Sequence, residues 1–187
     1  MNKQEIKSSA TKEKLCNSYL ELLKIKDINQ ITIKKITDNA GYNRGTFYIY
    51  YRDVYDMHNK IKNKFITNTQ NKVKMIIKDE NEINFETIFK VILDIFKKNE
   101  KYLVSLIAKD NTLSNDIKKS IKPLLKQIFK KEMNNTKADY LIEYHLASIF
   151  GVINLWIKNK KSISIKDLFN LLKQITTKGV FNVMKEL

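Results

Sequence analysis

Apolar residues recur at intervals of three and four along most of the chain, which is the spacing of helices that bury one face. The first such run predicts a helix over residues 11–26, with Ser9 or Thr11 as its N-cap. Its inner face holds four large side chains, Leu15, Tyr19, Leu22 and Leu23. The segment 27–30 breaks the pattern, so a separate element is expected after it.

A glycine hinge is predicted between two further short helices. The first covers residues 33–39, with Thr32 as its N-cap. Gly41 ends it, because a sharp turn needs a residue that adopts the left-handed conformation easily. Asn43 has the side chain of an N-cap for the next helix. These local signals predict a helix-turn-helix.

Longer helices are predicted for the rest of the chain. Asp53, followed three residues later by Asp56, resembles a capping box, and the helix that it opens extends to about Lys78. Amphipathic helices are then predicted over three ranges, 85–96, 102–107 and 114–133. Within the last of these, Pro123 should kink or restart the helix, because it removes an amide and its ring clashes with the preceding turn.

The last two predicted helices, over 140–158 and 165–184, form a distinct pair. The first is apolar over more than one face, and such a helix needs two packing partners. One face then packs on its own bundle and the other on a second copy of the chain, or both lie inside a monomeric bundle. The residues predicted for a dimer interface are Phe150, Gly151, Trp156 and Phe169.

The scarcity of helix-breaking residues supports one fold class throughout. Four glycines and one proline occur among 187 residues, so we expect an all-α protein with about nine helices. The pattern predicts two domains. A three-helix head covers residues 1–52, and a helical-bundle body covers residues 53–187.

Charge favours an anionic partner. Lys and Arg number 35 against 20 Asp and Glu, for a net charge of +15, which attracts polyanions or an anionic membrane surface. Lysine is also an ordinary solvating residue, so charge alone supports nucleic-acid binding weakly. No run approaches the ~18 apolar residues of a membrane span. With Cys16 as the single cysteine and no apolar signal-peptide core in residues 1–14, we expect a cytoplasmic protein without a membrane partner.

No catalytic arrangement is recognisable in the sequence. It holds no glycine-rich phosphate loop, no zinc-protease motif and no serine-hydrolase elbow. His58 and His145 stand alone and are interpreted as surface or core histidines. We therefore expect no catalytic residue, no cofactor and no metal site, and an all-helical enzyme is only a remote alternative.

The residues around the glycine hinge carry the hydrogen-bond donors that DNA would engage. Gly45 permits the close approach that a helix in the major groove requires, and Arg44 can make a two-pronged contact with guanine. The candidate DNA-binding residues are Thr32, Lys34, Asn43, Arg44, Gly45, Thr46, Tyr48, Tyr50 and Arg52, several of them expected at phosphates. An exposed tyrosine-rich helix could instead be a protein interface, but the neighbouring lysines favour DNA.

A multi-position pattern runs through the same segment. It consists of Ile31-Thr32-Ile33-x-x-Ile36, Ala40-Gly41, Asn43-Arg44-Gly45-Thr46-Phe47-Tyr48 and Tyr51-x-Asp53. Over about residues 12–57 it resembles the DNA-binding region of the TetR family of bacterial transcriptional regulators. The body, especially residues 150–156, is similar to a subgroup that includes regulators of dihydroxyacetone kinase operons.

The resemblance implies a homodimer whose third helices enter the major groove of a near-palindromic double-stranded DNA operator. It also implies a body that binds a small-molecule effector, of unknown identity, which releases a repressor from its operator. Many family members carry a lysine that faces a phosphate where this chain has Val54, and Arg52 is the expected substitute. A partner-dependent activator or a protein-interaction module of the same fold is the alternative.

Overall fold

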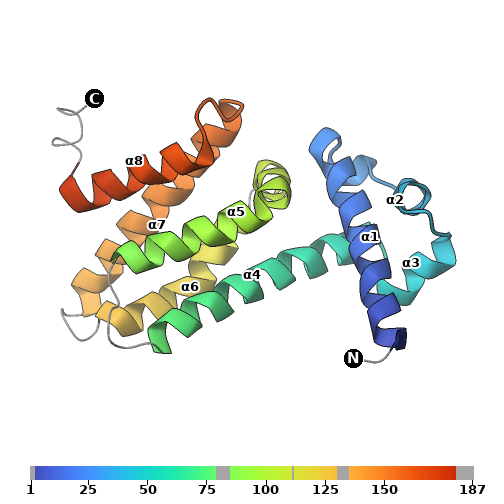
Figure 1. Ribbon diagram of the computed structural model, residues 1–187, viewed down its shortest axis with the longest axis horizontal. Helices are drawn as coiled ribbons and strands as arrows, with labels where there is room; N and C mark the ends of the chain where they lie inside the picture. The colour runs from blue at the N-terminus through green and yellow to red at the C-terminus, as the bar shows by residue number, and fades with distance from the viewer. Residues whose placement is uncertain (1–2, 79–84, 111, 130–134, 180–187) are drawn as a thin grey trace. The chain divides into compact units, whose positions relative to one another are not determined.

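The computed structural model of the chain describes residues 3–78, 85–110, 112–129 and 135–179. These residues form eight α-helices and one 3₁₀ helix, and they contain no strand (Figure 1). The elements are α1 (Lys3–Ile25), η1 (Ile28–Gln30), α2 (Ile33–Ala40), α3 (Arg44–Tyr50), α4 (Val54–Lys78), α5 (Phe85–Lys109), α6 (Leu113–Phe129), α7 (Asn135–Lys158) and α8 (Ile165–Lys178). The prediction of an all-α fold is confirmed.

The chain divides into two compact units. Unit 1 comprises Met1–Phe65 and Ser105–Asn111, and unit 2 comprises Ile66–Val104 and Thr112–Leu187. Helices α4 and α5 therefore each contribute residues to both units. The two domains predicted from the sequence, 1–52 and 53–187, stay a prediction. Unit 1 is larger than the predicted head, because it also includes the first part of α4 and the end of α5.

Helix α1 begins at Lys3, well before the start predicted at Thr11. Neither Ser9 nor Thr11 is its N-cap. Thr11 lies inside the helix, where its Oγ1 donates a 2.9 Å hydrogen bond to the carbonyl oxygen of Lys7. The preceding residues have no apolar period, but lysine, glutamine, glutamate and alanine among them are good helix formers. The helix therefore extends through a segment that periodicity could not detect.

Unit 1 is built around an apolar core supplied by α1 to α4. Its innermost side chains have no exposed surface: Leu15, Tyr19, Leu23, Ile36, Phe47 and Met57. The inner face predicted for the first helix is confirmed. Ser18 joins α1 to α2, because its hydroxyl donates a 2.7 Å hydrogen bond to the carbonyl oxygen of Ile36. Burial of each large apolar side chain contributes about 1.5–3 kcal/mol, so this core holds the short helices α2 and α3 in place.

Two interruptions expected in the body are absent. Residues 85–96 and 102–107 belong to one continuous helix, α5, and Pro123 lies within an uninterrupted α6. The lysine and glutamate residues between the two apolar runs favour a helix as much as the runs themselves do. Pro123 and Lys119 both lie on the exposed side of α6, where water can satisfy the carbonyl that the missing proline amide leaves unpaired.

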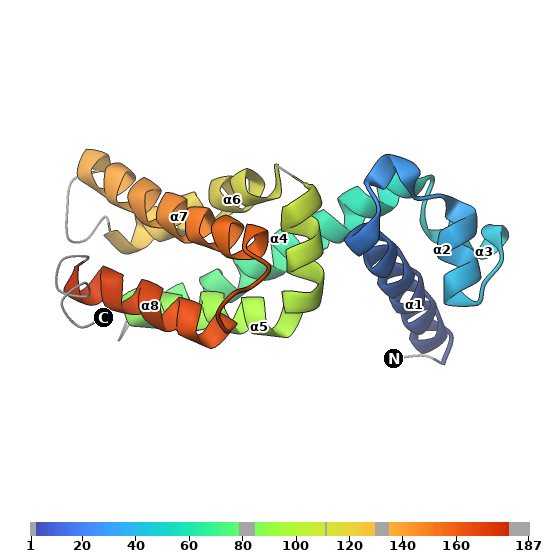
Figure 2. The same ribbon diagram turned by 90° about the horizontal axis from the view of Figure 1, so that it is seen from above.

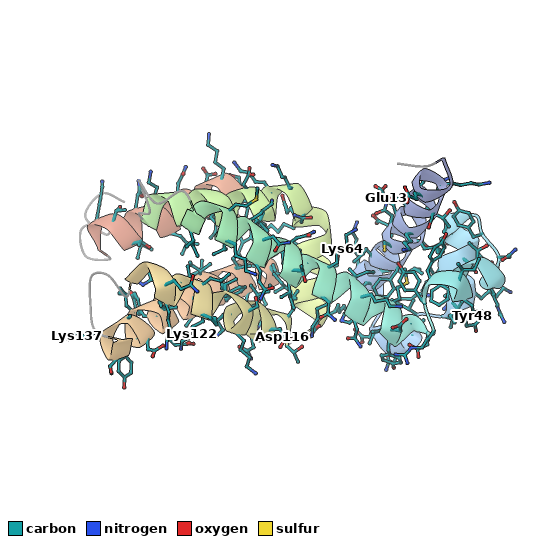
Figure 3. The ribbon with its side chains drawn as sticks, turned by 90° about the horizontal axis from the view of Figure 1, so that it is seen from below. Glu13, Tyr48, Lys64, Asp116, Lys122 and Lys137 are labelled. Atoms are coloured by element: carbon teal, nitrogen blue, oxygen red, sulfur yellow. The ribbon has the colours of Figure 1, made fainter. Side chains whose placement is uncertain are left out.

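The helices of unit 2 pack as a bundle in which α7 lies beside α6 and α8 (Figures 1 and 2). An aromatic cluster joins three of them. The ring centre of Phe96 on α5 lies 6.0 Å from that of Trp156 on α7 and 6.0 Å from that of Phe169 on α8. On the α6 side, Lys122, labelled in Figure 3, pairs with Glu143 of α7 at 3.3 Å. Apolar packing and charge pairing thus both fix α7.

Helix α7 presents two apolar lines. The buried line consists of Ala138, Ile142, Leu146, Ile149, Ile153 and Trp156. The exposed line consists of Tyr140, Tyr144, Ala147, Gly151 and Leu155. The prediction that this helix is apolar over more than one face is confirmed, and one of its faces has no cover within the described residues.

Helix α7 also contains the one described segment, Thr136–Lys158, that is long and apolar enough to cross a membrane by length and composition, and an 18-residue window within it has a mean hydropathy of 1.3. The expectation that no run approaches this size is corrected. The buried line accounts for part of the apolar character, since it packs inside unit 2. Glu143, in the same segment, pairs with Lys118 and Lys122 of α6, which suits a helix of a protein bundle.

Candidate nucleic-acid interface

The turn between α2 and α3 is set by the residues that the sequence indicated. The Oγ1 of Thr32 accepts a 3.3 Å hydrogen bond from the amide of Lys35 at the start of α2. Gly41 has φ of 72° and ψ of 36°, in the left-handed region, and its amide donates to the carbonyl oxygen of Asp38. The predicted cap and the predicted left-handed glycine are both confirmed.

Asn43 fixes the start of α3. Its Oδ1 accepts hydrogen bonds from the amide of Thr46 at 2.8 Å and from the hydroxyl of Thr46 at 3.1 Å. A Cβ added at Gly45 would lie 3.3 Å from this same Oδ1, which is tighter than most van der Waals contacts. A side chain at position 45 would therefore crowd the Asn43 cap. Its absence also leaves the surface of α3 open. Because the Thr46 hydroxyl already donates within the cap, a phosphate contact from it requires this bond to be exchanged.

Helix α3 has an inner and an outer side. Phe47 is fully buried, and Tyr51, which follows the helix, is 7% exposed. Arg44, Gly45, Tyr48 and Ile49 are exposed. Tyr48, labelled in Figure 3, is 58% exposed, and its ring makes an edge-to-face contact with the Phe47 ring at a centre-to-centre distance of 5.9 Å. The outer tyrosine thus rests on a fixed core residue with its hydroxyl available.

Lysines from two other helices join this surface, and no pattern in the sequence indicated them. The Nζ of Lys12 on α1 lies 5.3 Å from the ring centre of Tyr50, and the Nζ of Lys14 lies 6.0 Å from that of Tyr42. Lys60 of α4 donates a 3.0 Å hydrogen bond to the carbonyl oxygen of Tyr50 and so secures the end of α3. These contacts are tertiary, so no local motif could have revealed them.

The start of α4 differs in part from the predicted capping box. Asp53 Oδ1 accepts from the amide of Asp56 at 2.7 Å, as expected, but Asp56 Oδ2 accepts from the amide of Arg52 and not from that of Asp53. Lys60 also donates to Asp56 Oδ2 at 2.9 Å. The Arg52 amide and the Lys60 ammonium together lower the pKa of the Asp56 carboxyl. This carboxylate therefore joins the end of α3 to the first turn of α4.

Val54 and Arg52 occupy different environments at this junction. Val54 is 8% exposed and belongs to the core of unit 1, so its side chain is directed away from solvent. The Arg52 side chain is 87% exposed, and its Nη2 lies 3.7 Å from Asp56 Oδ1. Among the predicted DNA-binding residues, Thr32, Lys34, Asn43, Arg44, Gly45, Tyr48 and Arg52 are exposed, whereas Thr46 and Tyr50 are half-buried.

A buried polar network lies behind the helix-turn-helix, inside unit 1. His58 is 8% exposed, its Nδ1 lies 2.7 Å from the hydroxyl of Tyr19, and its Nε2 lies 3.1 Å from Asp110 Oδ2. Lys62 pairs with the same Asp110 oxygen at 3.2 Å. A carboxylate can only accept, so Nε2 donates to Asp110, and in the tautomer that carries its one proton on Nε2 the Nδ1 accepts from the Tyr19 hydroxyl. Burial, assisted by Asp110, raises the pKa of Tyr19, which keeps that proton in place.

The residues predicted for a dimer interface fall into two groups. Trp156 and Phe169 are 4% and 2% exposed within the single chain, and the Trp156 Nε1 donates a 2.8 Å hydrogen bond to the carbonyl oxygen of Ile163. These two residues are core residues of unit 2. Phe150 is half-buried and Gly151 is exposed, so these two remain available for contact with a second chain.

The part of the chain that the structure describes contains no candidate metal site. No group of three or more His, Cys, Asp or Glu side chains there could hold a metal ion. Cys16 is half-buried, and its Sγ lies 3.4 Å from the hydroxyl of Tyr51. Burial raises the pKa of this thiol, which favours the unreactive protonated form.

The chain combines a helix-turn-helix head with a helical-bundle body. This is the architecture of a bacterial transcriptional regulator. Residues 83–178, more than half of the chain, match the family model described as the C-terminal region of TetR-type transcriptional regulators. The chain belongs to the TetR family of transcriptional regulators. Family and fold are those of regulators and not of enzymes.

Solved structures share the fold over nearly the whole chain. NalD of Pseudomonas aeruginosa, the secondary repressor of the MexAB-OprM multidrug efflux pump, has a TM-score of 0.67 at 14% identity, covering 92% of this chain and 97% of that one. FadR of Bacillus subtilis, solved with stearoyl-CoA, has a TM-score of 0.63 at 13% identity, covering 90% and 98%. The dihydroxyacetone kinase operon activator DhaS has a TM-score of 0.63 at 16% identity, covering 93% and 96%. No curated protein matches the chain.

Proposed function

We propose that the chain is a cytoplasmic, homodimeric repressor that binds a near-palindromic operator through α3 and leaves it when a small molecule binds in unit 2. One observation carries this proposal. The outer side of α3 exposes Arg44, Gly45 and Tyr48, while Phe47 on the inner side is fully buried and Asn43 caps the first turn. A short helix held in this way presents its polar face as a rigid surface to the major groove.

The proposed contacts divide by chemistry. Arg44 reads guanine through its guanidinium, which presents two donors to the O6 and N7 acceptors. Lys34 and Arg52, both exposed, contact phosphates on either side of the groove. Lys12 and Lys14 lie close to the rings of Tyr50 and Tyr42 and add positive charge to this surface. Affinity should therefore depend strongly on salt, whereas base preference should depend on Arg44.

Arg44→Ala and Tyr48→Phe separate these two roles in a fixed-salt binding assay on a selected operator. Arg44→Ala should weaken binding by about 1–3 kcal/mol and relax base preference at its position. Tyr48→Phe removes one hydroxyl and should weaken all sequences alike. Unchanged operator affinity and preference in Arg44→Ala would refute the assignment of Arg44 to base reading.

For the homodimer we propose that a second copy covers the exposed line of α7. Its members Tyr140, Tyr144 and Leu155 are 75%, 62% and 57% exposed, which is unusual for three large side chains along one face of one helix. Gly151 lies in the same line, and a Cβ added there would meet nothing within 4 Å in the single chain. The glycine thus leaves a flat place at which another helix can approach closely.

Gly151→Lys tests the dimer without disturbing the fold of the single chain. The new side chain has room within unit 2, so the variant should remain helical while sedimenting as a monomer and losing operator affinity. Gln127→Lys adds the same charge at an exposed position of α6 and should remain dimeric. A dimeric Gly151→Lys protein would contradict this interface.

The effector part of the proposal rests on chain connectivity. Helices α4 and α5 each contribute to both units, so a ligand that repacks unit 2 acts on two helices that continue into the head. The effect on DNA affinity equals the preference of the ligand for the state that does not bind DNA. FadR, with which this chain shares its fold, was solved with stearoyl-CoA, and the effector here is proposed only as a small molecule.

Activation of transcription, with or without a protein partner, is a second candidate. It is favoured by the likeness to DhaS, which is described as an activator. A reporter gene placed behind the selected operator distinguishes the two. Deletion of the regulator should raise expression if it represses and lower expression if it activates, and co-purification of a partner protein would favour the partner-dependent form.

A further inference from the structure

One large apolar side chain on the outer side of α3 has no role in the contacts proposed so far. Ile49 is 74% exposed. It lies four residues after Gly45, so the two share one line along the helix, and the buried Phe47 lies two residues from each on the opposite side. Ile49 therefore occupies the outermost line of α3, on the turn after a residue that has no side chain.

An isoleucine at this place is not explained by the fold. It contributes nothing to the core of unit 1, and a β-branched residue is a poorer helix former than the polar residues that usually occupy exposed positions. The helix contains no acidic residue, and exposed Lys34, Arg44 and Arg52 lie in the same unit. This charge favours a polyanion as the occupant of the surface that includes Ile49.

We propose that Ile49 packs against the C5 methyl group of a thymine and is a specificity-determining residue of α3. The thymine methyl is the apolar group that base pairs present in the major groove. Gly45 lets the backbone of the first turn approach the base edges, and this approach brings Ile49, one turn later, to the depth of the groove floor. Together, Arg44 and Ile49 would then read a guanine and a thymine at separate positions of one half-site.

This inference rests on the proposed function, because it requires that α3 enters the major groove. It adds a distinct chemical claim, since uracil differs from thymine only by that methyl group. Replacing each thymine of a selected operator by uracil, one symmetric pair at a time, removes the methyl without changing any hydrogen-bonding group at the base edge. Loss of one methyl contact corresponds to an about four-fold loss of affinity per half-site.

The test is a double comparison of protein and DNA variants. The wild-type chain should lose about four-fold per half-site when one particular thymine becomes uracil, and Ile49→Ala should be indifferent to that change. Ile49→Val, which keeps a branched apolar side chain, should retain most of the sensitivity. Ile25→Ala, at another exposed isoleucine (76% exposed) outside α3, should behave as wild type. Circular dichroism confirms that each variant is folded.

Two negative results are distinguishable. In the first, the wild-type chain binds a selected sequence, but Ile49→Ala is as sensitive as the wild type to every uracil substitution. The role proposed for Ile49 is then wrong, while recognition by α3 still holds. If the chain selects no sequence from random DNA, the proposed function is wrong and the role of Ile49 is wrong with it.

Discussion

Removal of a single buried hydroxyl tests how unit 1 is held together. Tyr19 has no exposed surface, and its hydroxyl lies 2.7 Å from the Nδ1 of His58. The other ring nitrogen of His58 lies 3.1 Å from Oδ2 of Asp110, which directly follows α5. Tyr19→Phe keeps the ring and removes the donor, so the His58 Nδ1 loses its partner while it stays buried.

The expected cost follows from that geometry. A buried acceptor without a partner costs about 1–3 kcal/mol. The phenyl ring still fills the same space, so the cavity penalty of a larger truncation does not apply. Tyr55→Phe is the matched control, because it removes a hydroxyl from a tyrosine that is 56% exposed, and it should change stability by less than about 0.5 kcal/mol.

Urea unfolding at neutral pH, followed by circular dichroism, measures both variants. Tyr19→Phe should lower the midpoint while the slope with denaturant is unchanged, which identifies a loss of stability and not a change in the unfolded state. If Tyr19→Phe is as stable as both the wild type and the control, the buried network does not stabilise unit 1, and the assignment of the proton to Tyr19 is wrong.

Three further predictions concern the helix-turn-helix and its surroundings. Asn43→Ala removes the cap of α3 and should cost about 0.5–2 kcal/mol in urea unfolding, together with a loss of operator affinity; an unchanged affinity would contradict the role of the cap. The Arg52 amide and Lys60 lower the pKa of Asp56. The Asp56 carboxylate therefore contributes its full stabilisation above the ordinary aspartate pKa of about 3.9, and this stabilisation is lost as the pH falls through the lowered pKa. Asp56→Asn should therefore show a smaller loss of stability than wild type in acid titrations below about pH 4, and an identical titration would refute this. Burial raises the pKa of Cys16, so iodoacetamide should modify it much more slowly in the folded chain than in urea, and equal rates would show that the thiol is accessible and ionised.

The helix-turn-helix could be predicted because its signals are local. Thr32, Gly41 and Asn43 each act within four residues of their own position, through a cap or a left-handed turn. The start of α1 and the continuity of α5 could not be predicted in this way. Their polar segments are helical because lysine, glutamate and similar residues favour helix. The spacing of apolar residues does not report this preference.

The remaining parts of the site depend on tertiary contacts. Lys12 and Lys60 belong to α1 and α4, and their positions beside Tyr50 arise only when unit 1 packs. Trp156 was predicted for a dimer interface because α7 is apolar over two faces. Periodicity cannot say which of two apolar faces packs inside the chain, and the structure places Trp156 in the core of unit 2.

Selection of bound duplexes from a random DNA pool by the purified chain tests direct DNA recognition most directly. Recognition by two copies of α3 predicts enrichment of one near-palindromic sequence, with half-sites about one helical turn apart, and loss of that enrichment in Arg44→Ala. A pool that remains random after selection at moderate salt, with a chain that is folded by circular dichroism, would contradict sequence recognition by this protein.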